Sequence, residues 1–188
     1  MIDFLSNEEK YFSLYLDELK LKGIVNDYTN DVPSITLTNG FIKEYIKPMK
    51  KVDDKVLFQE LLPKRVYTPD FIIEWNPDNE YTKYFVHTLP DVISKVFTPF
   101  ITLSDNKSIV EIKNDFDQNN MTRLFQQNQS WIYDKYNIYI NLIKLPSLFK
   151  KTFTPVRYML TDKTLQERKL NYKPVLLNDY IISKTRNE

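Results

Sequence analysis

The residues best suited to chemistry are an acid and an amine two positions apart, Glu111 and Lys113. They lie in the apolar, β-branched run 108–114, which predicts a strand, and side chains two residues apart in a strand point to the same face. We therefore expect Glu111 and Lys113 side by side, with Val110 and Ile112 packed on the opposite face. An ion pair on a solvated edge strand would explain the same pattern.

A second acid, Asp70, comes directly before another apolar strand, expected over 71–75. Pro69 precedes it and cannot donate to a sheet ladder, so this dipeptide belongs at the start or edge of a strand. If the two strands are neighbours, Asp70 can converge with Glu111 and Lys113 on one point. Two carboxylates around a hard divalent cation, with an amine nearby, are suited to hydrolysis of phosphodiesters.

The pattern Pro69-Asp70 … Glu111-Ile112-Lys113 resembles the motif of the PD-(D/E)XK nucleases. The resemblance implies an α/β (α+β) fold with a restriction-endonuclease-like core, in which helices flank a mixed central β-sheet. It also implies that Asp70 and Glu111 bind Mg²⁺, with Mn²⁺ as a substitute, together with the backbone carbonyl of Ile112. Lys113 would orient or deprotonate the attacking water.

A capping box predicts the start of the first helix, with Ser6 as N-cap and Glu9 at the third helical position. Gly23 is expected to end this helix. Glu8 and Glu9 are both acids of the first turn, where the helix dipole stabilises negative charge. In many PD-(D/E)XK nucleases a glutamate of the first core helix joins the metal site. The resemblance implies this role for Glu9, preferred by its spacing, or for Glu8.

A later helix is expected over 121–136, followed by a buried strand over 138–143. Gln129 and Tyr133 lie four residues apart in this helix and therefore share a face. Their Q-x-x-x-Y pattern resembles the fourth motif of the RecB-like branch of the superfamily, which implies that they position Lys113 or the DNA backbone. The order helix, strands, Asp strand, Glu-x-Lys strand, helix, strand also resembles that of the family.

The stretch between the first helix and Asp70 is expected to form a hairpin. Strands over 34–38 and 41–46 flank an Asn39-Gly40 turn, and 56–62 forms either a short helix or a strand. Basic residues follow the hairpin at Lys47, Lys50, Lys51, Lys55, Lys64 and Arg65. They form either a solvated connection or a patch that contacts phosphates.

Two segments fall outside the family order: an insertion at about 76–107 and an extension at about 146–188. The insertion is expected to hold a strand over 81–87 and a helix over 90–97, and it could serve as a substrate lid. The extension interleaves basic and aromatic residues, which suits nucleic-acid contact or a docked part of the fold. The residues expected to contact nucleic acid are Lys50, Lys51, Arg123, Gln129, Tyr133, Lys150 and Lys151.

The composition excludes several other classes of site. The 188 residues include two glycines, one histidine and no cysteine. These counts exclude disulfides, thiolate zinc sites, H-E-x-x-H zinc sites and glycine-rich phosphate loops. The net charge of +1 neither indicates nor excludes nucleic-acid binding. The sequence shows no membrane span and no secretion signal, which predicts a cytoplasmic protein.

Together these features predict a single nuclease-like domain over 1–188 that acts as a Mg²⁺-dependent DNA endonuclease. The layout is similar to that of phage-encoded members of the superfamily, which implies the host cytoplasm, duplex or branched DNA as substrate, and a role in recombination or replication. A homodimer is one candidate state. Two alternatives stay open: a catalytically inactive nuclease-fold binding module, and a phage assembly protein in which the motif is coincidental.

Overall fold

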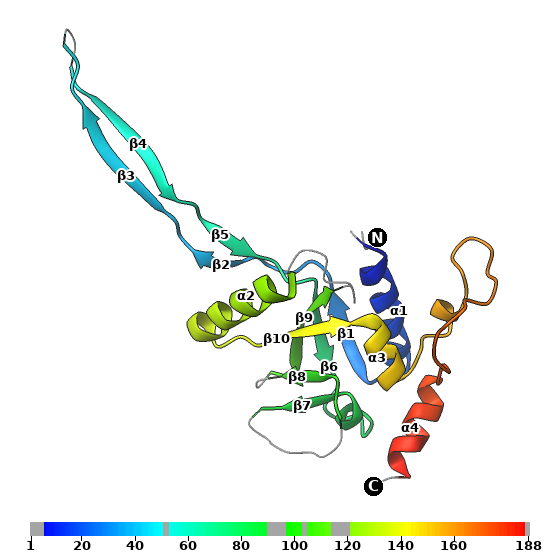
Figure 1. Cartoon of the computed structure of the whole chain (residues 1–188). Coiled ribbons are helices and arrows are strands. Elements are labelled where there is room, and N and C mark those ends of the chain that lie inside the picture. The colour runs from blue at the N-terminus through cyan, green and yellow to red at the C-terminus, as the bar shows by residue number, and fades with distance from the viewer. Residues whose placement is uncertain (1–5, 51–52, 90–96, 103–104, 114–120, 187–188) are drawn as a thin grey trace.

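The computed structural model describes residues 6–50, 53–89, 97–102, 105–113 and 121–186 (Figure 1). A four-stranded sheet in the order β1-β6-β9-β10 lies at its centre. Its strands are β1 (Val25–Thr29), β6 (Phe71–Trp75), β9 (Lys107–Lys113) and β10 (Ile140–Lys144). β6 is antiparallel to both β1 and β9, whereas β10 is parallel to β9. The predicted α/β class with a mixed central sheet flanked by helices is therefore confirmed.

Helix α1 (Asn7–Leu21) covers one face of this sheet. As predicted, the Ser6 hydroxyl accepts a hydrogen bond from the Glu9 N–H at 3.1 Å and donates one to the Glu9 carboxylate at 2.9 Å. Gly23 follows the helix with a φ of +72°, which suits glycine. The buried side of α1 includes Phe12, whose ring meets that of Phe71 edge-on at 5.2 Å. The capping box thus fixes where the helix begins against the sheet.

Helix α2 (Met121–Tyr136) covers the opposite face. Its Phe125 and Ile132 are buried with Ile140, and Ile109 packs against this cluster. Because α2 connects two parallel neighbours, β9 and β10, it runs antiparallel to both. The bounds of this helix agree with the prediction, and the following strand begins two residues later than expected.

The segment between β1 and β6 forms a long arm, not the expected hairpin at Asn39-Gly40 (Figure 1). β2 (Ile35–Thr38) pairs with β5 (Arg65–Tyr67), and β3 (Phe41–Lys47) pairs with β4 (Lys55–Leu62), both antiparallel. The chain passes through Gly40 without reversing and turns back only between β3 and β4. A Cβ at Gly40 would lie 2.7 Å from the Leu62 carbonyl oxygen, so glycine here permits close strand contact. We call residues 35–67 the ribbon.

The insertion between β6 and β9 packs at the far end of β9 from Lys113. It contains a 3₁₀ turn (Thr82–Tyr84), β7 (Val86–Thr88) and, parallel to it, β8 (Phe100–Thr102). The strand predicted over 81–87 is wrong in its first half, because the Thr82 hydroxyl bonds the Asn76 carbonyl at 2.6 Å and closes a turn there. The expected helix over 90–97 lies almost entirely outside the described residues.

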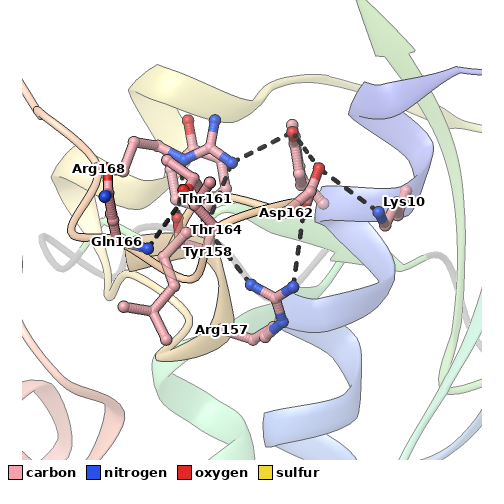
Figure 2. A network of polar contacts seen from close by, with 10 residues as sticks. Lys10, Arg157, Tyr158, Thr161, Asp162, Thr164, Gln166 and Arg168 are labelled. Atoms are coloured by element: carbon pink, nitrogen blue, oxygen red, sulfur yellow. Dashed lines mark hydrogen bonds and ion pairs between the residues drawn. The ribbon is translucent and has the colours of Figure 1, made fainter.

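The C-terminal extension docks on α1. It comprises α3 (Leu145–Lys151), a 3₁₀ turn (Arg157–Met159) and α4 (Leu177–Thr185). The rings of Tyr15 and Phe153 stack at 4.3 Å inside the core. At the surface, Asp162 accepts a hydrogen bond from the Tyr11 hydroxyl at 3.0 Å and pairs with Lys10 and Arg157 (Figure 2). These contacts favour the docked alternative for this segment. No helix in the described part of the chain is long and apolar enough to cross a membrane.

Candidate active site

The beginning of β6 and the end of β9 bring Asp70 together with the Glu-x-Lys strand. The Asp70 N–H donates to the Val110 carbonyl at 3.0 Å, and the Asp70 Oδ2 accepts from the Ile112 N–H at 2.6 Å. These two bonds hold Asp70 beside β9 although it precedes the first residue of β6. The antiparallel pairing of two neighbouring strands therefore produces the convergence that the sequence predicts.

Glu111 and Lys113 lie on the same face of β9, and their side chains form an ion pair between Oε1 and Nζ. Only 5% of Glu111 is exposed. Its second oxygen, Oε2, is buried and has no hydrogen-bond partner among the described residues. Because β9 lies between β6 and β10, it is not an edge strand. The alternative of a solvated edge-strand ion pair is therefore wrong.

The Asp70 carboxyl is a weaker acid than an ordinary aspartate. Burial, and after it the negative charge of Glu111, raise the pKa of the carboxyl to about 7, against the opposing hydrogen bond from the Ile112 N–H. Lys113 lowers this pKa by a smaller amount. The site thus concentrates more negative charge than its lysine compensates, which is the usual condition of a cation site before the cation binds.

The structure distinguishes Glu9 from Glu8. The charge of Glu9 acts on the Asp70 carboxyl and raises its pKa, by less than burial and the charge of Glu111 do. The charge of Glu8 acts instead on the phenol of Tyr158 in the C-terminal extension. Glu9 also closes the capping box with Ser6, and the two roles use the same first turn of α1.

Two residues at the site were not predicted from the sequence, and the first is Tyr67. Its hydroxyl oxygen is buried and makes no hydrogen bond of normal length to a described residue, but it lies against the Glu111 carboxylate. Burial, the negative charge of Glu111 and a hydrogen-bonding contact with it, and the charge of Asp70 raise the pKa of this phenol well above its usual value. Tyr67 stands three residues before Asp70 in the sequence, but only the fold reveals its position beside Glu111. It is also the last residue of β5, so the base of the ribbon enters the site.

The second site residue that was not predicted from the sequence is Lys144. It is the in-register partner of Lys113 across the parallel pair β9–β10, and in-register neighbours share a face of a sheet. Its side chain is half-buried. The predicted strand stopped at 143, one residue short of it. Lys144 adds a second basic residue on the face that carries Glu111 and Lys113.

The residues of this site fit a hard divalent cation. The available donors are carboxylate oxygens, which Mg²⁺ prefers, and the buried Oε2 of Glu111 has no competing partner in the described structure. A cation there would also offset the repulsion between Asp70 and Glu111. Within the described residues no three His, Cys, Asp or Glu side chains are grouped around one point. A Mg²⁺ ion would therefore keep several water molecules, as it usually does in proteins.

Gln129 and Tyr133 are not brought to Lys113. The Gln129 amide donates to the Ile140 carbonyl at 2.6 Å, and Ile140 pairs with Ile109, two residues before Glu111. Because α2 runs antiparallel to β9, its beginning, and not Gln129, lies level with Lys113. Tyr133 is 49% exposed. Gln129 therefore holds α2 to β10. The described contacts do not support positioning of Lys113 by Gln129 and Tyr133.

Of the other residues expected to bind nucleic acid, those that the structure describes lie on the surface, in three separate places. Arg123 is exposed near the beginning of α2, and Lys150 and Lys151 are exposed at the end of α3. The Lys151 ammonium lies 5.1 Å from the centre of the Phe97 ring. Lys50 is exposed at the tip of the ribbon, and Lys51 lies outside the described residues.

No protein-family model, curated protein or solved structure matches the chain. The chemistry of the site itself is therefore the basis for assigning a function.

Proposed function

We propose that the protein is a metal-dependent endonuclease that hydrolyses phosphodiester bonds in DNA. The observation that carries this proposal is the group formed by Asp70, Glu111 and Lys113. A half-buried carboxyl whose pKa is raised to about 7 lies beside a buried carboxylate with one unpaired oxygen and a lysine on the other. Such a group costs stability and is typical of a site that binds a ligand.

The element order supports the proposal. The chain runs α1, β1, β6, β9, α2, β10 through the central sheet, with the ribbon and the insertion between these elements. The resemblance to PD-(D/E)XK nucleases implies this order and implies the acids at the start of β6 and near the end of β9. The charge of Glu9 on α1 acts on Asp70, although these two acids and Glu111 are not grouped around one point within the described residues.

Each residue of the site would have a distinct task. Glu111 and Asp70 would hold Mg²⁺ through their carboxylate oxygens, and the Ile112 N–H would keep Asp70 oriented. The bound metal would supply an acidified water molecule and offset charge on the phosphate. Lys113 would orient that water and stabilise the negative charge that develops on the phosphate in the transition state. Lys144, on the same face, would attract the DNA backbone.

The substrate class and setting are part of the same proposal. Duplex or branched DNA is the substrate that we infer, and a structure-selective recombination or replication nuclease in phage-infected cytoplasm is the setting that the resemblance implies. A binding module or an assembly protein has no need for a buried carboxylate with an unpaired oxygen, whereas a metal site does. This difference makes both alternatives weaker than the nuclease.

The test is cleavage of a panel of plasmid, single strands, flaps and four-way junctions in Mg²⁺, Mn²⁺ or EDTA. We expect cutting in either metal, none in EDTA, and a rise in thermal stability of the wild-type protein on addition of metal. Glu111→Gln should lose both responses. Absence of cutting, combined with absence of a metal-induced thermal shift, would contradict the proposal.

A further inference from the structure

The two faces of the ribbon differ in chemistry. Cross-strand partners in an antiparallel pair lie on the same face, and alternate residues of a strand share that face. One face carries the pairs Lys43–Gln59, Tyr45–Leu57 and Lys47–Lys55. The other carries Ile42–Glu60, Glu44–Phe58 and Ile46–Val56. We call these the basic face and the apolar face.

The basic face is suited to a polyanion. Lys43, Lys47 and Lys55 are all exposed, and the strands β3 and β4, which are described in full, place no acidic residue on this face. Both acids of these strands, Glu44 and Glu60, lie on the apolar face instead. This separation concentrates positive charge on one side of the ribbon, although the net charge of the whole chain is only +1.

The ribbon is anchored beside the site. The Tyr136 hydroxyl of α2 donates to the Thr36 carbonyl of β2 at 2.6 Å, and the Lys135 ammonium bonds the same carbonyl at 3.2 Å. At the opposite strand of the base, β5 ends at Tyr67, whose hydroxyl lies in the electrostatic field of Glu111 and Asp70. From this base the ribbon extends away from the sheet (Figure 1). A ligand that spans the site and the ribbon must therefore be long.

We propose that the basic face of the ribbon binds the phosphate backbone of the duplex that flanks the cleaved bond. The inference rests on the proposed function, because that function places DNA at the base of the ribbon. Lysine ammonium groups bind phosphates without reading sequence, and a two-stranded ribbon is narrow enough to follow a major groove. The three lysines would set the position of the duplex and leave the chemistry to Glu111 and its neighbours.

The length of the ribbon determines how far its lysines lie from the site. Eight residues separate Tyr67 from Gln59, the partner of Lys43, and twelve separate it from Lys55. At about 3.3 Å per residue these stretches span roughly 26 and 40 Å. Duplex DNA rises about 3.4 Å per base pair. The lysines would therefore contact the duplex about 8 to 12 base pairs from the bond that is cut.

The experiment compares DNA binding in EDTA, where no cleavage occurs, by fluorescence anisotropy. The variant is Lys43→Gln/Lys47→Gln/Lys55→Gln, and the control is Lys22→Gln/Lys163→Gln/Lys173→Gln, which removes the same charge from exposed positions outside the ribbon. A second control, Ile42→Thr/Ile46→Thr, changes the apolar face and keeps β-branched residues. Circular dichroism and thermal melting verify that each variant is folded.

On a duplex of about 30 base pairs, we expect the ribbon-lysine variant to bind roughly tenfold more weakly than wild type. The slope of log affinity against log salt concentration should be smaller in magnitude by about 2 to 3, because three phosphate contacts are lost. Both controls should stay within about twofold of wild type. On a duplex of about 5 base pairs bound at the site, the ribbon-lysine variant should bind like wild type, because the duplex ends before the lysines begin.

Three results would overturn the inference: a ribbon-lysine variant that binds like wild type, an equal loss in the charge-matched control, or an equal loss in the apolar-face control. Cleavage assays in Mg²⁺ distinguish this failure from failure of the proposed function. Wild-type cutting with lysine-independent binding would remove the ribbon inference and leave the nuclease. Lysine-dependent binding without any wild-type cutting would support DNA binding by the ribbon and contradict the nuclease, and with it the placement of the cleaved bond at the base of the ribbon.

Discussion

The same two strands carry two acid–lysine pairs with opposite surroundings. Near one end of the β6–β9 pairing, Glu74 and Lys107 face each other at 3.7 Å, each with nearly half of its side chain exposed. At the other end Glu111 pairs with Lys113, and the Glu111 side chain is only 6% exposed. The residue types are identical, and only the second pair has Asp70 and Tyr67 beside it. Residue type and strand position alone therefore do not distinguish a surface ion pair from a site.

The two ion pairs differ in the free energy that their charges lose when they leave water. An exposed pair such as Glu74–Lys107 contributes little to stability, about 0 to 1 kcal/mol, because water solvates both charges well. A buried carboxylate loses that solvation, and its partner must compensate for the loss. At Glu111 the compensation is incomplete, since Oε2 has no partner in the described structure and Asp70 adds a second acid. This incomplete compensation indicates that an additional positive ligand belongs there.

The largest expected effect is on cleavage. Glu111→Ala should lower the cleavage rate by roughly 1,000-fold or more, because it removes a metal-holding carboxylate and the stabilisation of transition-state charge with it. Glu74→Ala, the matched change on the neighbouring strand, should leave the rate within about twofold of wild type. Initial rates on supercoiled plasmid in Mg²⁺ measure both. Equal losses in the two variants would mean that the buried pair has no special role.

The next largest effect is expected from replacing Lys113, in both the cleavage rate and the free energy of unfolding. Lys113→Ala should abolish cleavage while the protein still folds, with the free energy of unfolding lowered by about 2 to 4 kcal/mol because Glu111 is left without its cation. Lys107→Ala should lower it by no more than about 0.5 kcal/mol. Urea denaturation measures the difference. If Lys113→Ala prevented folding altogether, Lys113 would be a structural partner and not a catalytic residue.

The sequence predicted those parts of the molecule that depend on local pattern. The Ser6–Glu9 capping box and the bounds of α2 follow from short-range spacing. The meeting of Asp70 with the Glu-x-Lys strand was predicted only on the condition that the two strands are neighbours, which β6 and β9 are. The path through Asn39-Gly40 was predicted wrongly, because alternation indicates a strand without naming its partner, and β2 pairs with β5, not β3. Tyr67 and Lys144 were missed for a related reason, since only strand pairing and register bring them to the site.

A smaller effect should appear in the pH dependence of stability. The unfolded Asp70 carboxyl loses its proton near its ordinary pKa of 3.8, whereas the folded one keeps it until about pH 7. Between these values only the unfolded state releases the proton, so the contribution of Asp70 to the free energy of unfolding falls as pH rises and stays low above pH 7. Asp70→Asn removes this loss. In EDTA at about pH 8 it should be more stable than wild type by about 2 kcal/mol, after allowance for partial exposure.

The control for this prediction is the same comparison at about pH 3, where the two proteins should differ by less than about 0.5 kcal/mol because Asp70 is largely protonated in both states. Thermal or urea unfolding at the two pH values measures it. Addition of Mg²⁺ at the higher pH should stabilise wild type and not Asp70→Asn. A pH-independent difference between the proteins would mean that Asp70 does not hold its proton in the fold.

The smallest effect is expected at Tyr67, and it tests whether the second unpaired oxygen of the site belongs to the chemistry. Tyr67→Phe removes a buried hydroxyl that lies against the Glu111 carboxylate without a hydrogen bond of normal length, so the free energy of unfolding in EDTA should change by less than about 1 kcal/mol. Cleavage should change by less than about tenfold, since the carboxylates and Lys113 are untouched. Tyr28→Phe serves as a control, because the Tyr28 hydroxyl donates to Asp17 at 2.7 Å and its removal should destabilise the protein. A loss of stability at Tyr67 comparable to that at Tyr28 would show that the Tyr67 hydroxyl is hydrogen-bonded in solution and that the site is better satisfied than the two unpaired oxygens indicate.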